Sequence, residues 1–142
     1  MNIPFTKLDD QYNDCRSEID KAINKILNTT EFVNGPIIKV FEQKWAKHCS
    51  AEGSAAVSNG TQALVLALRA CGVRHGHQVI TTPHTYVSTV EAIKSIGADP
   101  VFVDIDDYYH IDTDKIEEKI SPKTKAILFV DLYGQTPDIS RL

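Results

Sequence analysis

The segment QVITTPHTYVSTVEAIKSIGADPVFVD, residues 78–104, carries the pattern that decides the fold. It begins with a short apolar run, 79–82, that Pro83 stops, and it ends with a second apolar run, 101–104. Between the two runs, residues 86–96 place apolar side chains three or four positions apart, which predicts an amphipathic helix. A strand, a helix and a strand of these lengths form one βαβ unit, and its two strands must run parallel.

The same alternation continues on both sides of this unit. Residues 55–58, AAVS, predict a buried strand that leads into an apolar helix at 63–70. Asp112 is expected to cap a helix that runs to Ile120, and residues 126–131 predict a fourth strand. Strands separated by helices in this way predict an α/β fold, with three layers: a mostly parallel sheet and helices on its two faces.

Two further helices are predicted ahead of the sheet. Apolar residues three or four positions apart run from Tyr12 to Leu27 and again from Ile37 to His48. The turn Asn34-Gly35-Pro36 lies between them, because glycine and proline interrupt a helix.

Composition narrows the class of protein. The 142 residues carry 15 Lys and Arg against 19 Asp and Glu, a net charge of -4. This balance argues against nucleic acid as a partner, since binding of the phosphate backbone needs a basic surface. The longest strongly apolar stretch, 63–68, is too short to span a bilayer, and the first residues lack the apolar segment of a secretory signal.

The three cysteines, Cys15, Cys49 and Cys71, are far apart and form no Cys-x-x-Cys pair. We interpret them as small core residues of a reduced protein. Together with the absence of an apolar leader or span, this predicts a cytoplasmic location and no membrane partner.

The candidate site lies where the predicted strands end, because ligands of open parallel sheets bind beyond the carboxyl ends of the strands. Gly60 and Thr61 follow the first strand and begin a helix, so free amides of its first turn and the positive end of its dipole could hold a phosphate. Gly60 would allow close approach, and the Thr61 hydroxyl adds a donor. The segment is neither a Walker loop nor G-x-G-x-x-G, and an ordinary capped turn is the alternative.

Tyr86 follows the next predicted strand, where a flat ring suits stacking on a flat heteroaromatic cofactor. The alternative is that Tyr86 is the first core residue of its helix. His75 and His77 supply only two ligands on a glycine turn, so no metal site is predicted. The acidic run at 104–107 is interpreted as a strand end followed by a solvated turn.

Taken together, these segments resemble the sugar-nucleotide aminotransferases of the DegT/DnrJ type, which have the aspartate-aminotransferase fold. The resemblance is carried, in order, by Gly35-Pro36 with Phe41-Glu42, AAVSNGTQALVLALRACGV, QVITTPHTYVSTVEAI, GADPVFVDID and ISPKTKAILFVDLYGQTPDI. It implies the large domain of the pyridoxal-phosphate-dependent transferases of fold type I, incomplete in this chain. Residues 1–36 would be an N-terminal arm and helix, and residues 37–142 the N-terminal part of the cofactor-binding domain.

The resemblance also implies roles for individual residues. Gly60, Thr61 and Gln62 match the loop that holds the phosphate of pyridoxal 5'-phosphate, and Tyr86 matches the aromatic residue that stacks on the pyridine ring. Residues 34–36 match a loop near the active-site mouth and the dimer partner. The family reaction transfers an amino group, usually from glutamate, to the keto group of a nucleotide-diphosphate keto sugar, and the full-length protein is expected to be a homodimer.

In the family, the Schiff-base lysine and the acid that protonates the pyridine nitrogen both lie beyond the point that corresponds to Leu142. No catalytic residue is therefore assigned in this chain, and the 142 residues alone are expected to be inactive and poorly stable. Asp131 stands where the family usually has a histidine, which places substrate contacts at that strand end in doubt.

Three alternatives remain open. The first is a sugar dehydratase of the same fold that also uses pyridoxal phosphate, in which a histidine replaces the lysine. The second is a phosphate-binding module without catalytic activity. The third is an unrelated Rossmann-like nucleotide-binding domain, against which the lack of G-x-G-x-x-G after the first strand argues.

Overall fold

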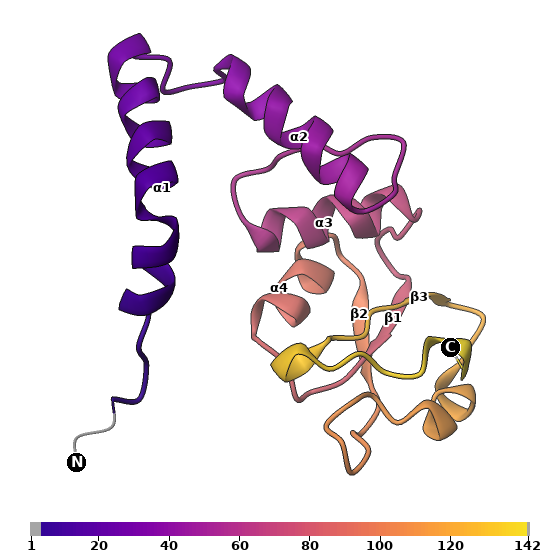
Figure 1. Cartoon of the computed structure of the whole chain (residues 1–142). Coiled ribbons are helices and arrows are strands. Elements are labelled where there is room, and N and C mark those ends of the chain that lie inside the picture. The colour runs from indigo at the N-terminus through magenta and orange to yellow at the C-terminus, as the bar shows by residue number, and fades with distance from the viewer. Residues whose placement is uncertain (1–3, 142) are drawn as a thin grey trace. The chain divides into compact units, whose positions relative to one another are not determined.

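The computed structural model describes residues 4–141, which cluster into two compact units that divide between Ala56 and Val57. The first unit contains two helices, α1 (Asp9–Thr29) and α2 (Pro36–His48) (Figure 1). The predicted turn is confirmed: Asn34 has a left-handed backbone with φ 51°, and Pro36 occupies the first turn of α2, where its missing N–H costs nothing.

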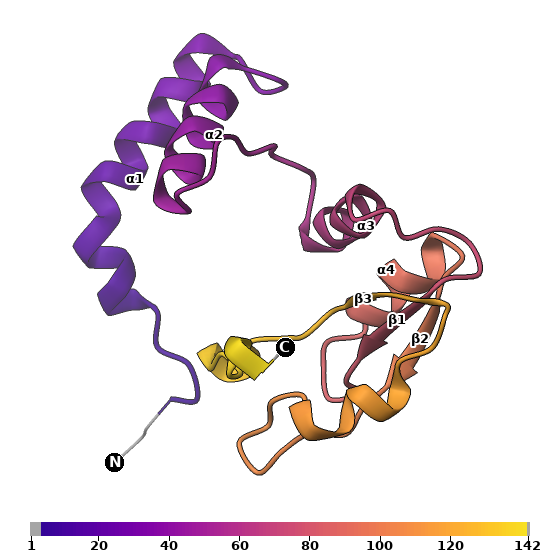
Figure 2. The ribbon, with the colours of Figure 1, turned by 90° about the vertical axis from the view of Figure 1, so that its right-hand side faces the viewer.

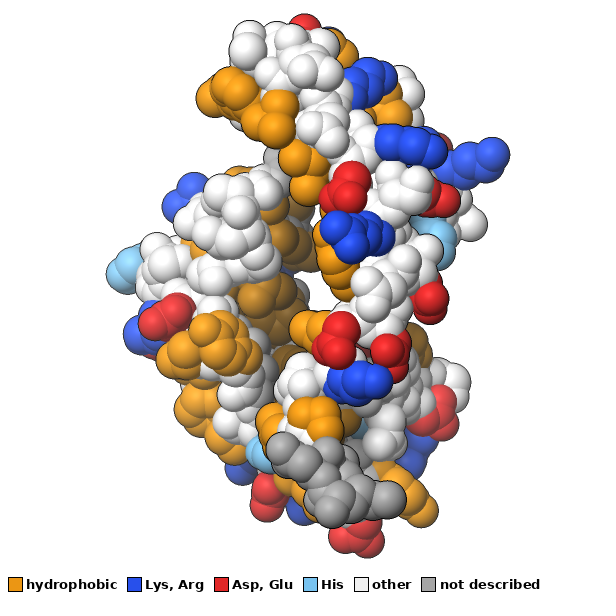
Figure 3. Space-filling model, turned by 60° about the vertical axis from the view of Figure 1, so that its left-hand side comes forward, with side chains coloured by type: hydrophobic (Ala, Val, Ile, Leu, Met, Phe, Trp, Pro, Cys, Tyr) orange, Lys and Arg blue, Asp and Glu red, His pale blue; other side chains and the backbone are white. Residues whose placement is uncertain are grey.

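The apolar stripes of α1 and α2 are largely exposed to solvent. The exposed side chains include Tyr12, Ile19, Ile23 and Leu27 on α1 and Ile37, Val40, Phe41 and Trp45 on α2. Figure 3 shows hydrophobic side chains at the surface among acidic and basic ones. The periodicity therefore identifies a face of each helix that is suited to burial, but the described residues do not bury it.

The second unit is built on a parallel sheet, which confirms the predicted fold class. Within residues 4–141 its strands are β1 (Gln78–Thr81), β2 (Asp99–Phe102) and β3 (Thr124–Ile127), in the order β2-β1-β3. Ile80 of β1 lies opposite Val101 of β2 and Ile127 of β3. Both pairings are parallel, because α4 (Ser88–Ser95) and the segment 103–123 return the chain to the same end of the sheet.

The two faces of the sheet are covered by different segments, which makes three layers. On one face, Val79 packs with Leu68 of α3 (Gly60–Ala70) and Ile93 of α4. On the other face, the neighbouring Ile80 packs with Ile111 and Ile116 from the segment after β2. Figure 2 shows α3 and α4 on one side of the sheet and this segment on the other.

The strand predicted at 55–58 was wrong: in the described chain these residues pair with no strand. The N–H of Ala56 instead donates to the Glu42 carboxylate at 2.8 Å, and the Ser54 hydroxyl donates to the Glu42 carbonyl at 2.7 Å. A short apolar run becomes a strand only when a neighbouring strand accepts its hydrogen bonds. Here a side chain satisfies the backbone instead.

The helix predicted to run from Asp112 to Ile120 was also wrong in part. Its cap is confirmed, because the Asp112 carboxylate accepts from the N–H of Asp114 at 3.1 Å. The chain then forms two short 3₁₀ turns, η1 (Thr113–Lys115) and η2 (Glu117–Lys119). A helix this short depends on packing for its stability, and Ile116 is the buried residue of the segment.

Cys15, Cys49 and Cys71 are exposed, so the interpretation of these residues as core residues was wrong. Two of them, Cys49 and Cys71, are the residues at which α2 and α3 end. None of the helices found in residues 4–141 is both long and apolar enough to cross a membrane.

The division at Ala56 reflects the contacts within this chain. The predicted boundary between residues 1–36 and 37–142 concerns the domains of the longer family members and stays a prediction.

Candidate functional site

The N-terminus of α3 has the geometry of an anion site. Asn59 caps the helix with an extended backbone, φ −165°, and its side chain accepts from the N–H of Gln62 at 2.9 Å. The Asn59 carbonyl accepts from the N–H of Ala63 at 3.1 Å. The amides of Gly60 and Thr61 donate to no acceptor among the described residues. Two amides and the positive end of the helix dipole therefore remain for an anion.

Gly60 leaves open space at this helix end. A Cβ built on Gly60 would have no neighbour within 4 Å, and Gly60 does not have the positive φ that would require a glycine. The absent side chain is thus not needed for the turn, but it leaves room for a ligand next to the backbone. The N–H of Gln62 is already bound to Asn59, so only the exposed side chain of Gln62 is free to contact a ligand.

Tyr86 lies in the loop from β1 to α4, and its side chain is 74% exposed. The alternative that Tyr86 is a core residue was therefore wrong. The loop itself is held by local hydrogen bonds: the Thr82 hydroxyl accepts from the N–H of His84 at 3.2 Å, and the hydroxyls of Thr85 and Thr89 lie 2.8 Å apart. This ordered loop presents the Tyr86 ring to solvent, where it is available to a flat ligand.

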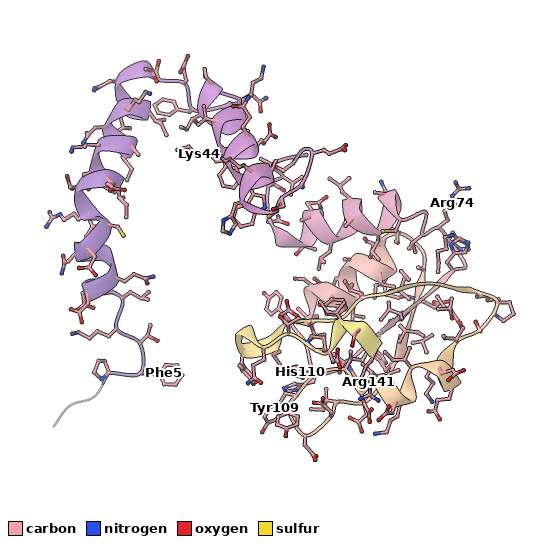
Figure 4. The ribbon with its side chains drawn as sticks, turned by 45° about the vertical axis from the view of Figure 1, so that its right-hand side comes forward. Phe5, Lys44, Arg74, Tyr109, His110 and Arg141 are labelled. Atoms are coloured by element: carbon pink, nitrogen blue, oxygen red, sulfur yellow. The ribbon has the colours of Figure 1, made fainter. Side chains whose placement is uncertain are left out.

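A cluster of aromatic rings lies beyond the carboxyl ends of the strands, and the sequence prediction missed it. His84 follows β1, Tyr109 follows β2 and Tyr133 follows β3. Ring centroids of His84 and Tyr109 are 5.7 Å apart, those of His84 and Tyr133 are 6.3 Å apart, and those of Tyr109 and Tyr133 are 6.0 Å apart. Figure 4 shows Tyr109 beside His110 at the lower edge of this unit. The order of the strands brings the three rings together.

The acidic run after β2 is a turn, as predicted. The Asp106 carboxylate accepts from the N–H of Tyr108 at 2.8 Å and from that of His110 at 2.9 Å, which ties the loop to itself. His75 and His77 lie on their own glycine turn, where His77 Nδ1 accepts from the N–H of Arg74. Across residues 4–141, no group of three or more His, Cys, Asp or Glu side chains could hold a metal ion.

Two charged pairs on this unit shift pKa values of their members. The Lys94 amine, 2.8 Å from Asp99, lowers the pKa of that carboxyl. The Lys115 amine, 2.8 Å from Asp112, does the same for Asp112, and the pKa of Lys115 is raised in return. Asp99 is exposed and Asp112 is half-buried, and each carboxyl is held in its ionised form by a neighbouring amine, so they are poor candidates for moving a proton near neutral pH.

Three surface hollows of the first unit are lined by residues other than the predicted cofactor residues, and one of them, of about 520 Å³, is lined by residues between 13 and 24. Another, of about 660 Å³, is lined by residues between 39 and 54, and a smaller one, of about 180 Å³, is lined by residues between 22 and 40. The predicted residues Gly60, Thr61, Gln62 and Tyr86 all belong to the second unit. None of these three hollows is therefore formed by the predicted site.

Comparison with known proteins identifies relatives of the chain. Residues 13–142 match the model of the DegT/DnrJ/EryC1/StrS aminotransferase family. The chain is 40% identical over 141 residues to the dTDP-3-amino-3,6-dideoxy-alpha-D-galactopyranose transaminase of Aneurinibacillus thermoaerophilus, a match that covers 99% of this chain and 39% of the relative. The chain thus spans about two fifths of the length of the curated relatives that it matches.

Two solved structures resemble the chain closely. The crystal structure of DesV from S. venezuelae has a TM-score of 0.91 and 36% identity, and the match covers 98% of this chain and 38% of DesV. The structure of NtdA from Bacillus subtilis, solved with its cofactor PMP bound, has a TM-score of 0.91 and 34% identity. That match covers 99% of this chain and 33% of NtdA.

Proposed function

Since the chain belongs to the DegT/DnrJ/EryC1/StrS aminotransferase family, we propose that it forms part of an enzyme that transfers an amino group to a nucleotide-linked keto sugar, with pyridoxal 5'-phosphate as the cofactor. The observation that carries the proposal is the open N-terminus of α3. Within residues 4–141, the amides of Gly60 and Thr61 there have no hydrogen-bond acceptor, and there is space for a ligand beside them. Such an end suits the phosphate of this cofactor.

Different residues are proposed to contact the phosphate and the ring of the cofactor. Gly60 and Thr61 would hold the phosphate through their amides and the Thr61 hydroxyl, and the exposed side chain of Gln62 would lie at the edge of this site. Tyr86 would lie against the ring, since its side chain is exposed on an ordered loop. When bound, the cofactor supplies the electron sink for amino transfer, and the protein supplies position and electrostatics.

The relatives support the substrate class. The Aneurinibacillus relative is a transaminase of a dTDP-linked amino sugar, and NtdA was solved with PMP, the amino form of the same cofactor. By analogy with the family, we also propose that glutamate is the amino donor and that the complete protein is a homodimer. Residues 37–142 would then be part of the cofactor-binding domain. No lysine of this chain is assigned to covalent attachment of the cofactor. The free cysteines suit a cytoplasmic location, where thiols stay reduced.

The proposal is tested on the complete protein that the gene encodes. The protein is supplied with pyridoxal phosphate and ¹⁵N-labelled glutamate, together with a panel of dTDP-, UDP- and GDP-linked keto sugars. The expected result is one amino sugar that carries the label, detected by mass spectrometry, and no product when glutamate is omitted. Loss of water from the sugar without incorporation of the label would favour the dehydratase. Failure to take up the cofactor would contradict the proposal.

A further inference from the structure

The ring cluster of His84, Tyr109 and Tyr133 has features of a binding surface rather than of a core. Tyr109 is 51% exposed and Tyr133 is 73% exposed, so both rings present much of their area to solvent. Aromatic rings in a core are usually covered, whereas exposed rings grouped at the carboxyl edge of a parallel sheet lie where ligands bind.

The backbone at both tyrosines is unusual. Tyr109 has φ 68° and Tyr133 has φ 58°, in the left-handed region that side chains other than glycine rarely adopt. The N–H of Tyr109 donates to the Asp106 carbonyl at 3.1 Å, and the N–H of Gly134, next to Tyr133, donates to the Asp131 carbonyl at 3.1 Å. The two loops thus hold the rings in place at some conformational cost, which is more common at functional sites than elsewhere.

His84 supplies a polar group to the same cluster. Its Nε2 atom is buried and has no hydrogen-bond partner among residues 4–141. Buried polar atoms are nearly always hydrogen-bonded, so this nitrogen is a candidate to bind a polar group of a ligand. The exposed Tyr133 ring lies beside His84, with ring centroids 6.3 Å apart, so a ligand bound on the Tyr133 ring would lie next to this nitrogen.

The cluster is joined to the proposed cofactor site by one short loop. His84 and Tyr86 are two residues apart, so their Cα atoms are at most about 7 Å from each other. A molecule bound on the cluster would therefore lie next to a cofactor that contacts Tyr86. This is the place that the amino acceptor must occupy in the proposed reaction.

The angle between the planes of the two tyrosine rings favours the sugar ring of the acceptor over its flat base. The Tyr109 and Tyr133 rings are nearly perpendicular, at 88°, and so form a corner instead of two parallel walls. A flat base is best held between parallel faces, whereas a sugar ring has C–H groups on its faces and hydroxyls around its rim. The corner offers ring faces for the C–H groups, and the tyrosine hydroxyls and His84 offer hydrogen bonds.

We propose that Tyr109 and Tyr133 form the surface that recognises the sugar ring of the amino acceptor and that His84 positions both rings and binds a sugar hydroxyl. The inference rests on the proposed function, because it takes the acceptor to be a nucleotide-linked sugar. It goes further in naming the residues of this chain that contact the sugar.

The test distinguishes the contribution of the sugar to binding from that of the nucleotide. For the complete protein, isothermal titration gives the Kd of dTDP and dTDP-glucose, of UDP and UDP-glucose, and of GDP and GDP-mannose. For the pair that binds the unmodified protein most tightly, the ratio of the two Kd values measures the contribution of the sugar. The variants Tyr109→Leu and Tyr133→Leu are expected to reduce this ratio by about threefold to tenfold, the range typical of an aromatic contact, and to leave the Kd of the nucleoside diphosphate unchanged.

Tyr108→Leu is the matched control, because Tyr108 is 69% exposed in the same loop and outside the cluster. It should leave the ratio unchanged. His84→Ala should reduce the ratio, and His84→Gln, which keeps a hydrogen-bonding group, should restore part of it. Equal ratios in the tyrosine variants and the control would overturn the proposal, as would a panel in which no sugar improves binding. Uptake of pyridoxal phosphate, followed by absorbance, reports separately on the proposed function.

Discussion

The side chain of Asn59 accepts a hydrogen bond from the backbone N–H of Gln62 at 2.9 Å, which satisfies one of the free amides at the start of α3 and leaves two others open. One residue therefore does two things. It caps the first turn of α3. It also leaves the amides of Gly60 and Thr61 without a partner, next to the space where Gly60 has no side chain.

Asn59→Ala should destabilise the protein by about 1 kcal/mol, because it removes the acceptor of the Gln62 N–H. Asn59→Asp keeps an acceptor at the same place, so stability should be retained. It also adds a negative charge beside the proposed phosphate site, so the affinity for pyridoxal phosphate should fall. Urea denaturation and cofactor titration of the same two variants check this prediction. Parallel loss of stability and affinity in both variants would contradict it.

Leu68 and Leu66 test the packing of α3 on the sheet. Leu68 is 4% exposed and packs against Val79 and Ile93, whereas Leu66, on the same helix, is 49% exposed. Leu68→Ala should lower the free energy of unfolding by about 2–5 kcal/mol, because it leaves a cavity. Leu66→Ala should change it by less than about 0.5 kcal/mol. Thermal or urea unfolding compares the two, and equal effects would mean that α3 packs by another face.

The Asp112–Lys115 ion pair should make stability depend on pH in acid. The Lys115 amine lowers the pKa of the Asp112 carboxyl from its ordinary value of 3.8. A lowered pKa in the folded state means that the pair stabilises the protein above pH 3.8 and that this stabilisation is lost as the pH falls through the lower, folded value. Lys115→Met should therefore be less stable than the unmodified protein at neutral pH, and the difference should disappear once the pH is below the lowered, folded-state pKa of Asp112.

Lys119→Met is the control for this comparison, because the Lys119 amine lies 3.4 Å from the neighbouring Glu118 and away from the Asp112 cap. Urea midpoints for the three proteins between pH 2 and pH 7 give the result. A difference between Lys115→Met and the unmodified protein that stays constant over this range would show that the pair contributes nothing through charge.

The isolated 142-residue chain should associate with itself in solution. Large apolar side chains such as Ile23, Leu27, Phe41 and Trp45 are exposed on α1 and α2, and exposed apolar stripes of this kind promote association. Sedimentation at several protein concentrations should show species larger than the monomer. A monomer with a single cooperative unfolding transition over the whole range would contradict this expectation and the predicted poor stability.

Sequence patterns predicted the parts of the fold that depend on local signals. Pro83 and Gly97 bound the helix between β1 and β2, and the strands on either side were found within two residues of their observed starts. Residues 55–58 have an equally good strand pattern, but whether a run becomes a strand depends on a partner that is distant in sequence. For the same reason, helix periodicity marked the apolar faces of α1 and α2 without showing what covers them.

The candidate site was predicted only in its local part. Gly60 and Thr61 follow a strand-like run and begin a helix, and this arrangement is visible in a few consecutive residues. His84, Tyr109 and Tyr133 are far apart in the sequence, and only the parallel order of β2, β1 and β3 brings their rings together. One signal was available: each residue lies a few positions after the end of a predicted strand, where the side chains of a parallel sheet converge.

The open end of α3 is proposed to bind the phosphate of pyridoxal phosphate. Two variants of the complete protein, Gly60→Asp and the control Gly53→Asp, test this through their Kd values for pyridoxal phosphate and for pyridoxal, which lacks the phosphate. Gly53 also has open space around it but lies in the first unit. We expect Gly60→Asp to weaken binding of pyridoxal phosphate by about tenfold or more and to leave pyridoxal binding unchanged, whereas Gly53→Asp should change neither. Unchanged binding of pyridoxal phosphate by Gly60→Asp, or equal weakening by the two variants, would contradict it.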